Sequence, residues 1–223
     1  MPIELDHIFI LVPCQAPGAG RLTEIGLNEG DPNSHPGQGT ACRRFFFRNA
    51  YLELLWLSDV DEVQSGLVPR MRLLERWTSK HGSACPFGLV FRPAARPDCP
   101  PPFDVWEYRP GYLAAPQIIE VGTNSEAIAE PLLFHLPFAV RPDLNSALAP
   151  QPREHSAGLE NISRVELVSP HSHGPSREFR ALVEAGLVQL RVGSEHVVEI
   201  SFDQERRGKR ADLRPALPLV LSW

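Results

Sequence analysis

A single histidine and a single glutamate stand alone in apolar stretches that are typical of buried strands. Residues 3–12 read IELDHIFILV, and His7 is the only imidazole among them. Residues 51–57 read YLELLWL, and Glu53 is their only charge. An imidazole and a carboxylate that face one buried space are suitable ligands for a divalent metal ion. These two residues therefore predict a metal site between an early strand and a later one.

Both residues also have a structural explanation. A lone histidine in a strand is more often a hydrogen-bonded core residue, and a lone glutamate more often pairs with an arginine. Arg43, Arg44 and Arg48 are close to Glu53 in sequence. A buried carboxylate is costly unless it is paired, protonated or bound to a metal. The question that decides between the readings is which group meets Glu53.

A hairpin is predicted to carry Glu53. Two apolar runs, residues 43–48 and 51–57, are separated by Asn49-Ala50, and a turn-rich loop, HPGQGT at residues 35–40, precedes them. Strand alternation puts Glu53 on one face of the second run together with Tyr51, Leu55 and Leu57. The loop has two readings, a structural turn or a source of backbone N–H groups for an anionic substrate.

Three short motifs together resemble one family. LDHI in the first strand, HPGQGT before the hairpin and YLELL in its second strand are similar to a glyoxalase-like domain of the vicinal-oxygen-chelate superfamily. The resemblance implies an α+β fold in which paired βαβββ modules form a cupped mixed sheet. It also implies a divalent metal ion in the cup, held by a histidine of the first strand and a glutamate of the fourth, roles that fall on His7 and Glu53. No organic cofactor is indicated. The likeness returns in residues 154–159, where Ser156 stands in place of the family's proline.

The chain is expected to form a single glyoxalase-like domain over residues 1–223. We divide it into an N-terminal βαβββ module (3–57), middle strands (87–140) that could supply the second set of strands, and a C-terminal βαβββ-like module (162–223). The last module should join the same sheet, because its strands look apolar on both sides. It lacks a counterpart of His7, since the matching stretch is Ser163-Arg164-Val165-Glu166. Amphipathic helices are predicted at 67–80, ending near His81-Gly82, and at 176–185, with Ser176 as its N-cap.

A metal site needs further ligands, and three acidic or imidazole side chains qualify. His135 lies between apolar neighbours, Glu199 resembles Glu53 in its context, and Glu120 follows two isoleucines. Of these we expect His135 to be the third metal ligand, and Glu199 to act with Glu53 in catalysis by moving a proton. His171 and His173 lie in a loop with glycine and proline, which favours exposed loop histidines.

The resemblance implies a small-molecule enzyme. A metal ion held by His7 and Glu53 would bind two neighbouring oxygens of a substrate and stabilise an enediolate or enolate, in lyase, isomerase or dioxygenase chemistry. The alternative is a non-catalytic protein that sequesters a small molecule in the same cup. Its possible wall residues are aromatic: Phe9, Phe45, Phe47, Trp106 and Tyr108. A third reading is a structural or protein-interaction domain with a filled cup.

Composition excludes several other classes of protein. The 223 residues are 43% hydrophobic and 22% charged, as in an ordinary globular protein. A net charge of −5 argues against a nucleic-acid partner. No apolar run reaches about 18 residues, so no membrane span is expected. Four widely spaced cysteines and the lack of a signal-peptide pattern favour a reduced, cytoplasmic protein. The expected partner is a small-molecule substrate or ligand, and a homodimer is left open.

Overall fold

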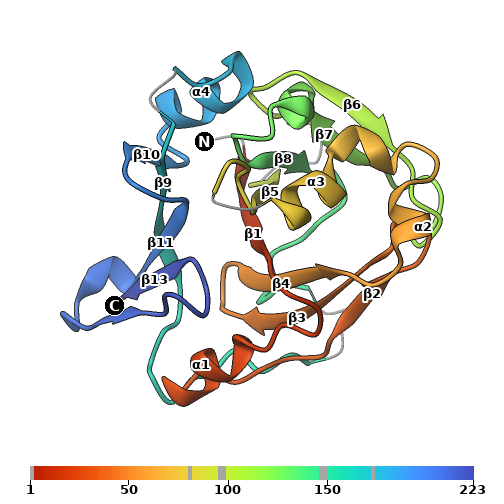
Figure 1. Cartoon of the computed structure of the whole chain (residues 1–223). Helices are drawn as coiled ribbons and strands as arrows, with labels where there is room; N and C mark the ends of the chain where they lie inside the picture. Colours follow the sequence, from red (N-terminus) through yellow and green to blue (C-terminus); the bar gives the residue numbers. More distant parts are fainter. Residues whose placement is uncertain (1–2, 80–81, 95–98, 146–149, 172–173) are drawn as a thin grey trace.

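An eight-stranded mixed sheet dominates the computed structural model, which describes residues 3–79, 82–94, 99–145, 150–171 and 174–223. The strands lie in the order β2-β3-β4-β1-β5-β8-β7-β6. Their bounds are β1 Ile3–Leu11, β2 Asn33–His35, β3 Thr40–Phe46, β4 Tyr51–Leu57, β5 Phe87–Pro93, β6 Val105–Tyr108, β7 Ile119–Gly122 and β8 Leu132–His135. Figure 1 shows the sheet curled into an open half-barrel with one concave face.

The curled sheet consists of two halves with the same internal order. In the first half β1 pairs in parallel with β4, and in the second half β5 pairs in parallel with β8. Strands β1 and β5 join the halves through an antiparallel pairing. With α1 (Ala19–Glu24) between β1 and β2, residues 3–57 form the expected βαβββ order. The second half lies within the middle strands expected at 87–140.

The C-terminal strands form a sheet of their own, which corrects the expectation that they join the cup. This five-stranded sheet has the order β10-β9-β11-β13-β12. Its strands are β9 Ile162–Ser169, β10 Gln189–Val192, β11 Val197–Phe202, β12 Arg210–Asp212 and β13 Leu219–Ser222, and α4 (Arg177–Glu184) connects β9 to β10. Because β9 and β10 are parallel neighbours, the sheet does not repeat the strand order of the first half.

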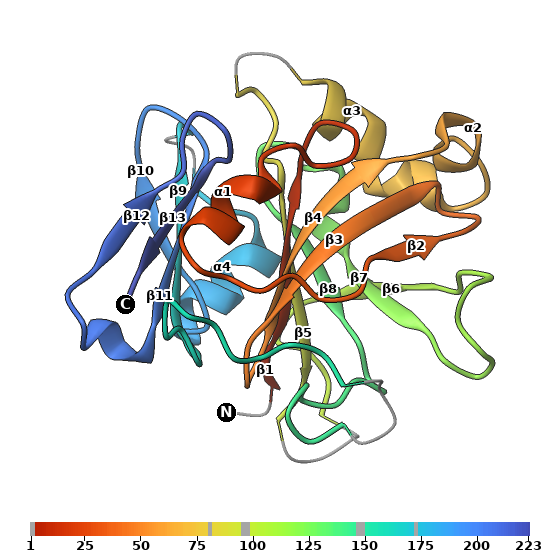
Figure 2. The ribbon, with the colours of Figure 1, turned by 90° about the horizontal axis from the view of Figure 1, so that it is seen from below.

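The C-terminal strands form a separate sheet because only one of its two faces is buried. Its outer face is not apolar, because it carries ion pairs from Arg191 to Glu166 and Glu199 and from Arg210 to Glu199. Its inner face packs against the convex side of the curled sheet in one continuous core. Figure 2 shows the two sheets side by side, and Figure 1 shows α4 and α1 at opposite ends of the space between them. A sheet with one solvated face needs one partner surface, and the convex side supplies it.

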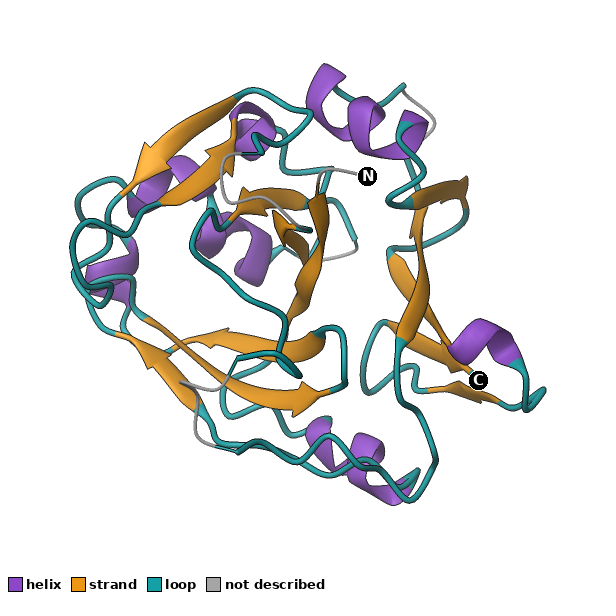
Figure 3. Cartoon of the chain, turned by 180° about the vertical axis from the view of Figure 1, so that it is seen from behind, coloured by secondary structure: helices purple, strands orange, loops and turns teal. Residues whose placement is uncertain are grey.

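Short helical segments cover the concave side. The predicted helix at 67–80 is two pieces, a 3-10 helix (Val68–Met71) and α3 (Leu73–Thr78), separated by Arg72 with φ 54°. The expected end near His81 lies outside the described residues. Together with α2 (Val60–Val63), these pieces pack on apolar side chains of the concave face. Figure 3 shows how short the helices are beside the strands. In the described part of the chain, no helix has the length and apolar character needed to cross a membrane.

Candidate functional site

The concave face holds a cavity of about 210 Å³. Strands of both halves line it, and the helical segment at 68–73 closes one side through Met71 and Leu73. His7, Tyr51 and Glu53 all line this cavity. The structure therefore places the two residues singled out in the sequence on one surface.

A hydrogen-bond chain fixes the ring of His7. The pairing of β1 with β5 shifts its register between Leu5 and His7, and Asp6 is the extra residue. Asp6 Oδ1 lies 2.7 Å from His7 Nδ1, and its Oδ2 accepts a bond of 2.9 Å from the fully buried Arg92. Burial opposes ionisation of Asp6, but the hydrogen bond from His7 and the charge of Arg92 outweigh it and keep the pKa below its ordinary value. With Nδ1 bound to Asp6, His7 presents Nε2 to the cavity.

Glu53 is 4% exposed, and its two carboxylate oxygens face different partners. Oε2 lies 3.8 Å from His7 Nε2, and Oε1 accepts a weak bond of 3.5 Å from the Cys42 thiol. No arginine among the described residues pairs with it. Arg43 binds Glu29 and Arg48 binds Glu160.

Arg44 lies opposite Glu53 in the β3–β4 pairing, yet it turns elsewhere. Its guanidinium donates to the carbonyl oxygens of Asp31 and Pro32 and lies 5.1 Å from the centre of the Phe46 ring. In the described part of the chain, therefore, no arginine accounts for the burial of Glu53.

Two further side chains join Glu53 at its other oxygen. His35, Cys42 and Glu53 offer ligand atoms that all lie within 4.8 Å of one another. Burial lowers the pKa of His35, and its ring is held between Thr40 and Asn33 at 2.9 and 3.1 Å. Burial and the charge of Glu53 raise the pKa of Cys42, which keeps the thiol protonated. Neither residue is among the ligands predicted from the sequence, although Cys42 is the diagonal neighbour of Glu53 across the hairpin.

The two halves of the sheet contribute unlike walls. The imidazoles and the carboxylate come from the first half, whereas the second half adds mostly apolar side chains and Tyr112. The second-half strands line the cavity with Val90, Ile119 and Phe134. Tyr112 closes the rim, because its hydroxyl donates to Gln38 at 3.0 Å. The cavity is therefore polar on one side and apolar on the other.

Three other predicted residues lie elsewhere. His135 pairs across the sheet with Phe91, which belongs to the core behind the cup, and binds Glu120 at 2.7 Å. Phe134, one position earlier, takes the place facing the cavity. Glu199 lies in the second sheet and pairs with Arg191 and Arg210. The expectations that His135 is a metal ligand and that Glu199 moves a proton at the site are therefore not supported by this geometry.

The HPGQGT loop is built as a turn. The backbone N–H groups of Gln38 and Gly39 donate to the carbonyl of His35, and that of Gly37 donates to Glu62 at 2.7 Å. At Gly39, φ is 73° and an added Cβ would lie 2.2 Å from the Asp59 carbonyl oxygen, so only glycine fits. These N–H groups already have acceptors, which favours the structural reading over anion binding.

The structure is a cupped mixed sheet, consistent with the vicinal-oxygen-chelate fold, and a titratable cluster lies on its concave face. Residues 5–96 match the family model that is described as a glyoxalase-like domain. No curated protein matches the chain. A hypothetical protein from Staphylococcus aureus has a similar fold over 98% of both chains, at 10% identity and a TM-score of 0.55. A hypothetical protein from Bacillus halodurans matches over 60% of this chain and 93% of its own, at 16% identity and a TM-score of 0.36.

Proposed function

We propose that the cup binds one divalent metal ion through His7 and Glu53, together with a small organic substrate that carries two neighbouring oxygens. The observation that carries this proposal is the setting of Glu53. It is a buried carboxylate without an arginine or lysine partner among the described residues, and it faces an imidazole nitrogen 3.8 Å away. Such a carboxylate is costly unless a cation or proton meets it.

The donor set fits a metal ion. Metal–ligand distances of about 2.0–2.2 Å allow one ion to touch two atoms that lie 3.8 Å apart. The Asp6–His7 bond is the carboxylate–histidine pair that commonly orients a metal-binding imidazole. His35 and Cys42, which lie close to Glu53, would add nitrogen and sulfur ligands once the thiol loses its proton and His35 releases a hydrogen bond on metal binding. Nitrogen, sulfur and one carboxylate suit zinc or another first-row transition metal better than calcium or magnesium.

Different residues around the site would orient the metal ligand, bind the substrate and accept a proton. A bound divalent ion would act as a Lewis acid that polarises neighbouring substrate oxygens. Asp6 holds His7 with Nε2 facing the cavity, and Tyr51 stacks on its ring at 4.3 Å between centroids. The apolar wall from the second half would bind the carbon skeleton and exclude water. Glu53 is the carboxylate that lines the cavity, so it is also the candidate proton acceptor.

The test compares Glu53→Gln with Glu120→Gln. Glu120 forms a carboxylate–imidazole pair with His135 outside the cup, which makes it a matched control. Protein purified without chelator and loaded with zinc, manganese or nickel is analysed for its metal content. We expect about one ion per chain in the wild type and in Glu120→Gln, and a large loss in Glu53→Gln with a nearly unchanged melting temperature of the apoprotein.

A metal-free binding protein is the second candidate, and one observation favours it. The second half of the sheet adds apolar cavity walls and no imidazole or carboxylate to the lining. If the wild type takes up no metal and Glu53→Gln melts much lower, the metal proposal fails. The cup would then be assigned to binding of an apolar small molecule.

A further inference from the structure

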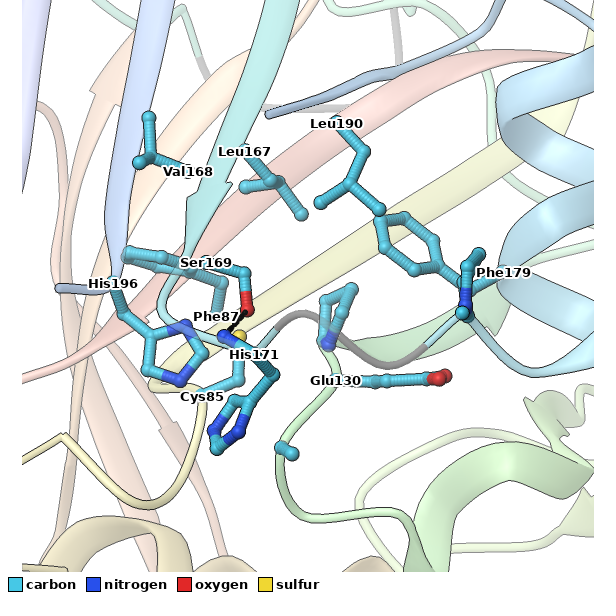
Figure 4. A pocket seen from close by; sticks show the side chains of 14 residues that line it. Cys85, Phe87, Glu130, Leu167, Val168, Ser169, His171, Phe179, Leu190 and His196 are labelled. Atoms are coloured by element: carbon cyan, nitrogen blue, oxygen red, sulfur yellow. Dashed lines mark hydrogen bonds between the residues drawn. The ribbon is translucent and has the colours of Figure 1, made fainter. Parts of the chain in front are cut away.

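A second cavity lies between the two sheets, on the side of β5 away from the cup. Its volume is about 250 Å³. Phe87 of β5 and Cys85 line one side, and β9, α4 and β10 contribute Leu167, Phe179 and Leu190 (Figure 4). It shares no lining residue with the cup. The lining is apolar over most of its area, with two imidazoles at one end.

Those two imidazoles are His171 and His196. Their ring centroids lie 5.4 Å apart, and Figure 4 shows the rings beside each other. The Nε2 atom of each ring is buried and has no hydrogen-bond partner in the part of the chain that the structure describes. His196 is only 6% exposed. His171 is half-buried with its Nε2 atom covered, so it is not the exposed loop residue that its sequence context predicts. His173 lies outside the described residues. Buried polar atoms without partners are rare, so this pair of nitrogens points to a ligand.

The charged groups near the cavity already have hydrogen-bond partners within the protein. The Glu130 carboxylate accepts bonds from Ser176 N, Ser176 Oγ and Asn124. Arg76 donates to the carbonyl oxygens of Cys85 and Ile128, among others. Burial, His171 and Arg76 lower the pKa of His196 to about 4, so its ring is neutral near pH 7. A charged ligand would find no free counter-charge in the cavity, whereas a neutral ligand needs none.

A metal ion does not explain the two nitrogens. Cys85 lines the same cavity, so a site with two histidines and one cysteine is conceivable from composition. Among the described residues, however, the one group of three such side chains with ligand atoms within 4.8 Å is the cluster at Glu53 in the cup.

We propose that this inter-sheet cavity is a second binding site, for a small neutral aromatic molecule that carries one hydroxyl group. A hydroxyl donates one hydrogen bond and accepts two, so it can satisfy both Nε2 atoms whenever at least one of them carries its proton. Phe87 and Phe179 offer ring faces and edges to an aromatic ligand. The volume suffices, because a cavity of about 150 Å³ in another protein holds benzene.

Phenol is the probe, and toluene is the matched ligand without a hydroxyl. Binding is followed by the 15N chemical shifts of the imidazoles in the full chain, assigned with His171→Phe and His196→Phe. We expect phenol to shift the His171 and His196 signals saturably and to bind about tenfold more tightly than toluene. His196→Phe should lower the phenol affinity to the toluene level, and Glu53→Gln, in the cup, should leave it unchanged.

Three results would overturn the proposal. Phenol could leave both imidazole signals unmoved, which would mark the cavity as merely hydrated. Phenol and toluene could bind equally well, which would leave the histidines without a role. Stoichiometric zinc could move both signals where phenol does not, which would assign the pair to a metal. The wild-type titration decides the first and third results even if a variant fails to fold.

Discussion

The Nε2 atom of His7 lies 3.8 Å from Oε2 of Glu53, while Nδ1 of the same ring lies 2.7 Å from Asp6. One imidazole thus joins a buried ion pair behind the sheet to a carboxylate in the cup. Asp6 in turn binds Arg92, which also binds Glu4 and the Asn49 carbonyl. Residues behind the cup therefore set the orientation of the residue that faces it.

Asp6→Asn should weaken metal binding in the cup. The substitution keeps the shape of the side chain but removes the charge that favours the Nδ1–H tautomer of His7. Loss of such a supporting partner typically lowers metal affinity by about 10–100-fold. The measurement is a zinc titration against a competing chelator. Asp143→Asn, at a surface pair with Arg141, is the control and should bind as the wild type does. Equal affinities in all three proteins would contradict a role for Asp6.

Arg92→Met should destabilise the fold strongly. Arg92 is fully buried, and its removal leaves Asp6, itself 4% exposed, without its cationic partner. Breaking a buried pair in this way costs about 3–5 kcal/mol in the free energy of unfolding. Urea unfolding measures it, with Arg141→Met as a control expected to lose less than about 1 kcal/mol. The double variant Asp6→Asn/Arg92→Met should recover part of the loss, and no recovery would mean that the pair is not the cause.

Stability should fall as the pH drops below about 6.5, and buried histidines should cause part of this loss. Burial lowers the pKa of His155, whose two ring nitrogens bind the Asn28 N–H and the Phe46 carbonyl. Burial lowers the pKa of His196 to about 4. Because the folded pKa lies below the unfolded value of 6.5, the unfolded chain binds more protons in this window.

His196→Phe isolates one contribution to this pH dependence. Its free energy of unfolding should decline less than that of the wild type between about pH 6.5 and pH 4, because the variant has no imidazole to protonate there. Urea unfolding across the window gives the two slopes. Parallel curves for the variant and the wild type would show that His196 does not contribute.

Gly88→Ala should distort the cup. An added Cβ at Gly88 would lie 2.0 Å from the ring of Phe9, which lines the cavity. Overpacking of this kind costs about 1–3 kcal/mol and would push Phe9 into the cavity. Melting temperature and ligand affinity should both fall. Gly111→Ala is the control, because nothing lies within 4 Å of its added Cβ. A variant that retained wild-type stability would mean that Phe9 moves aside freely.

The sequence by itself determined the local features of the site. Alternation along a strand depends only on the backbone, so it grouped Glu53 with Tyr51 and Leu55, which also line the cavity. The isolation of each residue among apolar neighbours also indicated burial. The hairpin brought Cys42 near Glu53 through the pairing of adjacent strands, a relation that register counting from the turn can find.

Tertiary structure alone decided which strands share a sheet. Strand pairing between distant segments depends on which apolar surfaces cover one another, and this is not visible in local periodicity. The inner face of the C-terminal strands covers the convex side of the cup, so Glu199 is removed from the site. In β8 a shift of one position decides the outcome, since Phe134 faces the cavity and His135 faces the core behind it. The same packing of sheet on sheet created the cavity of His171 and His196, two residues from separate loops that no sequence spacing relates.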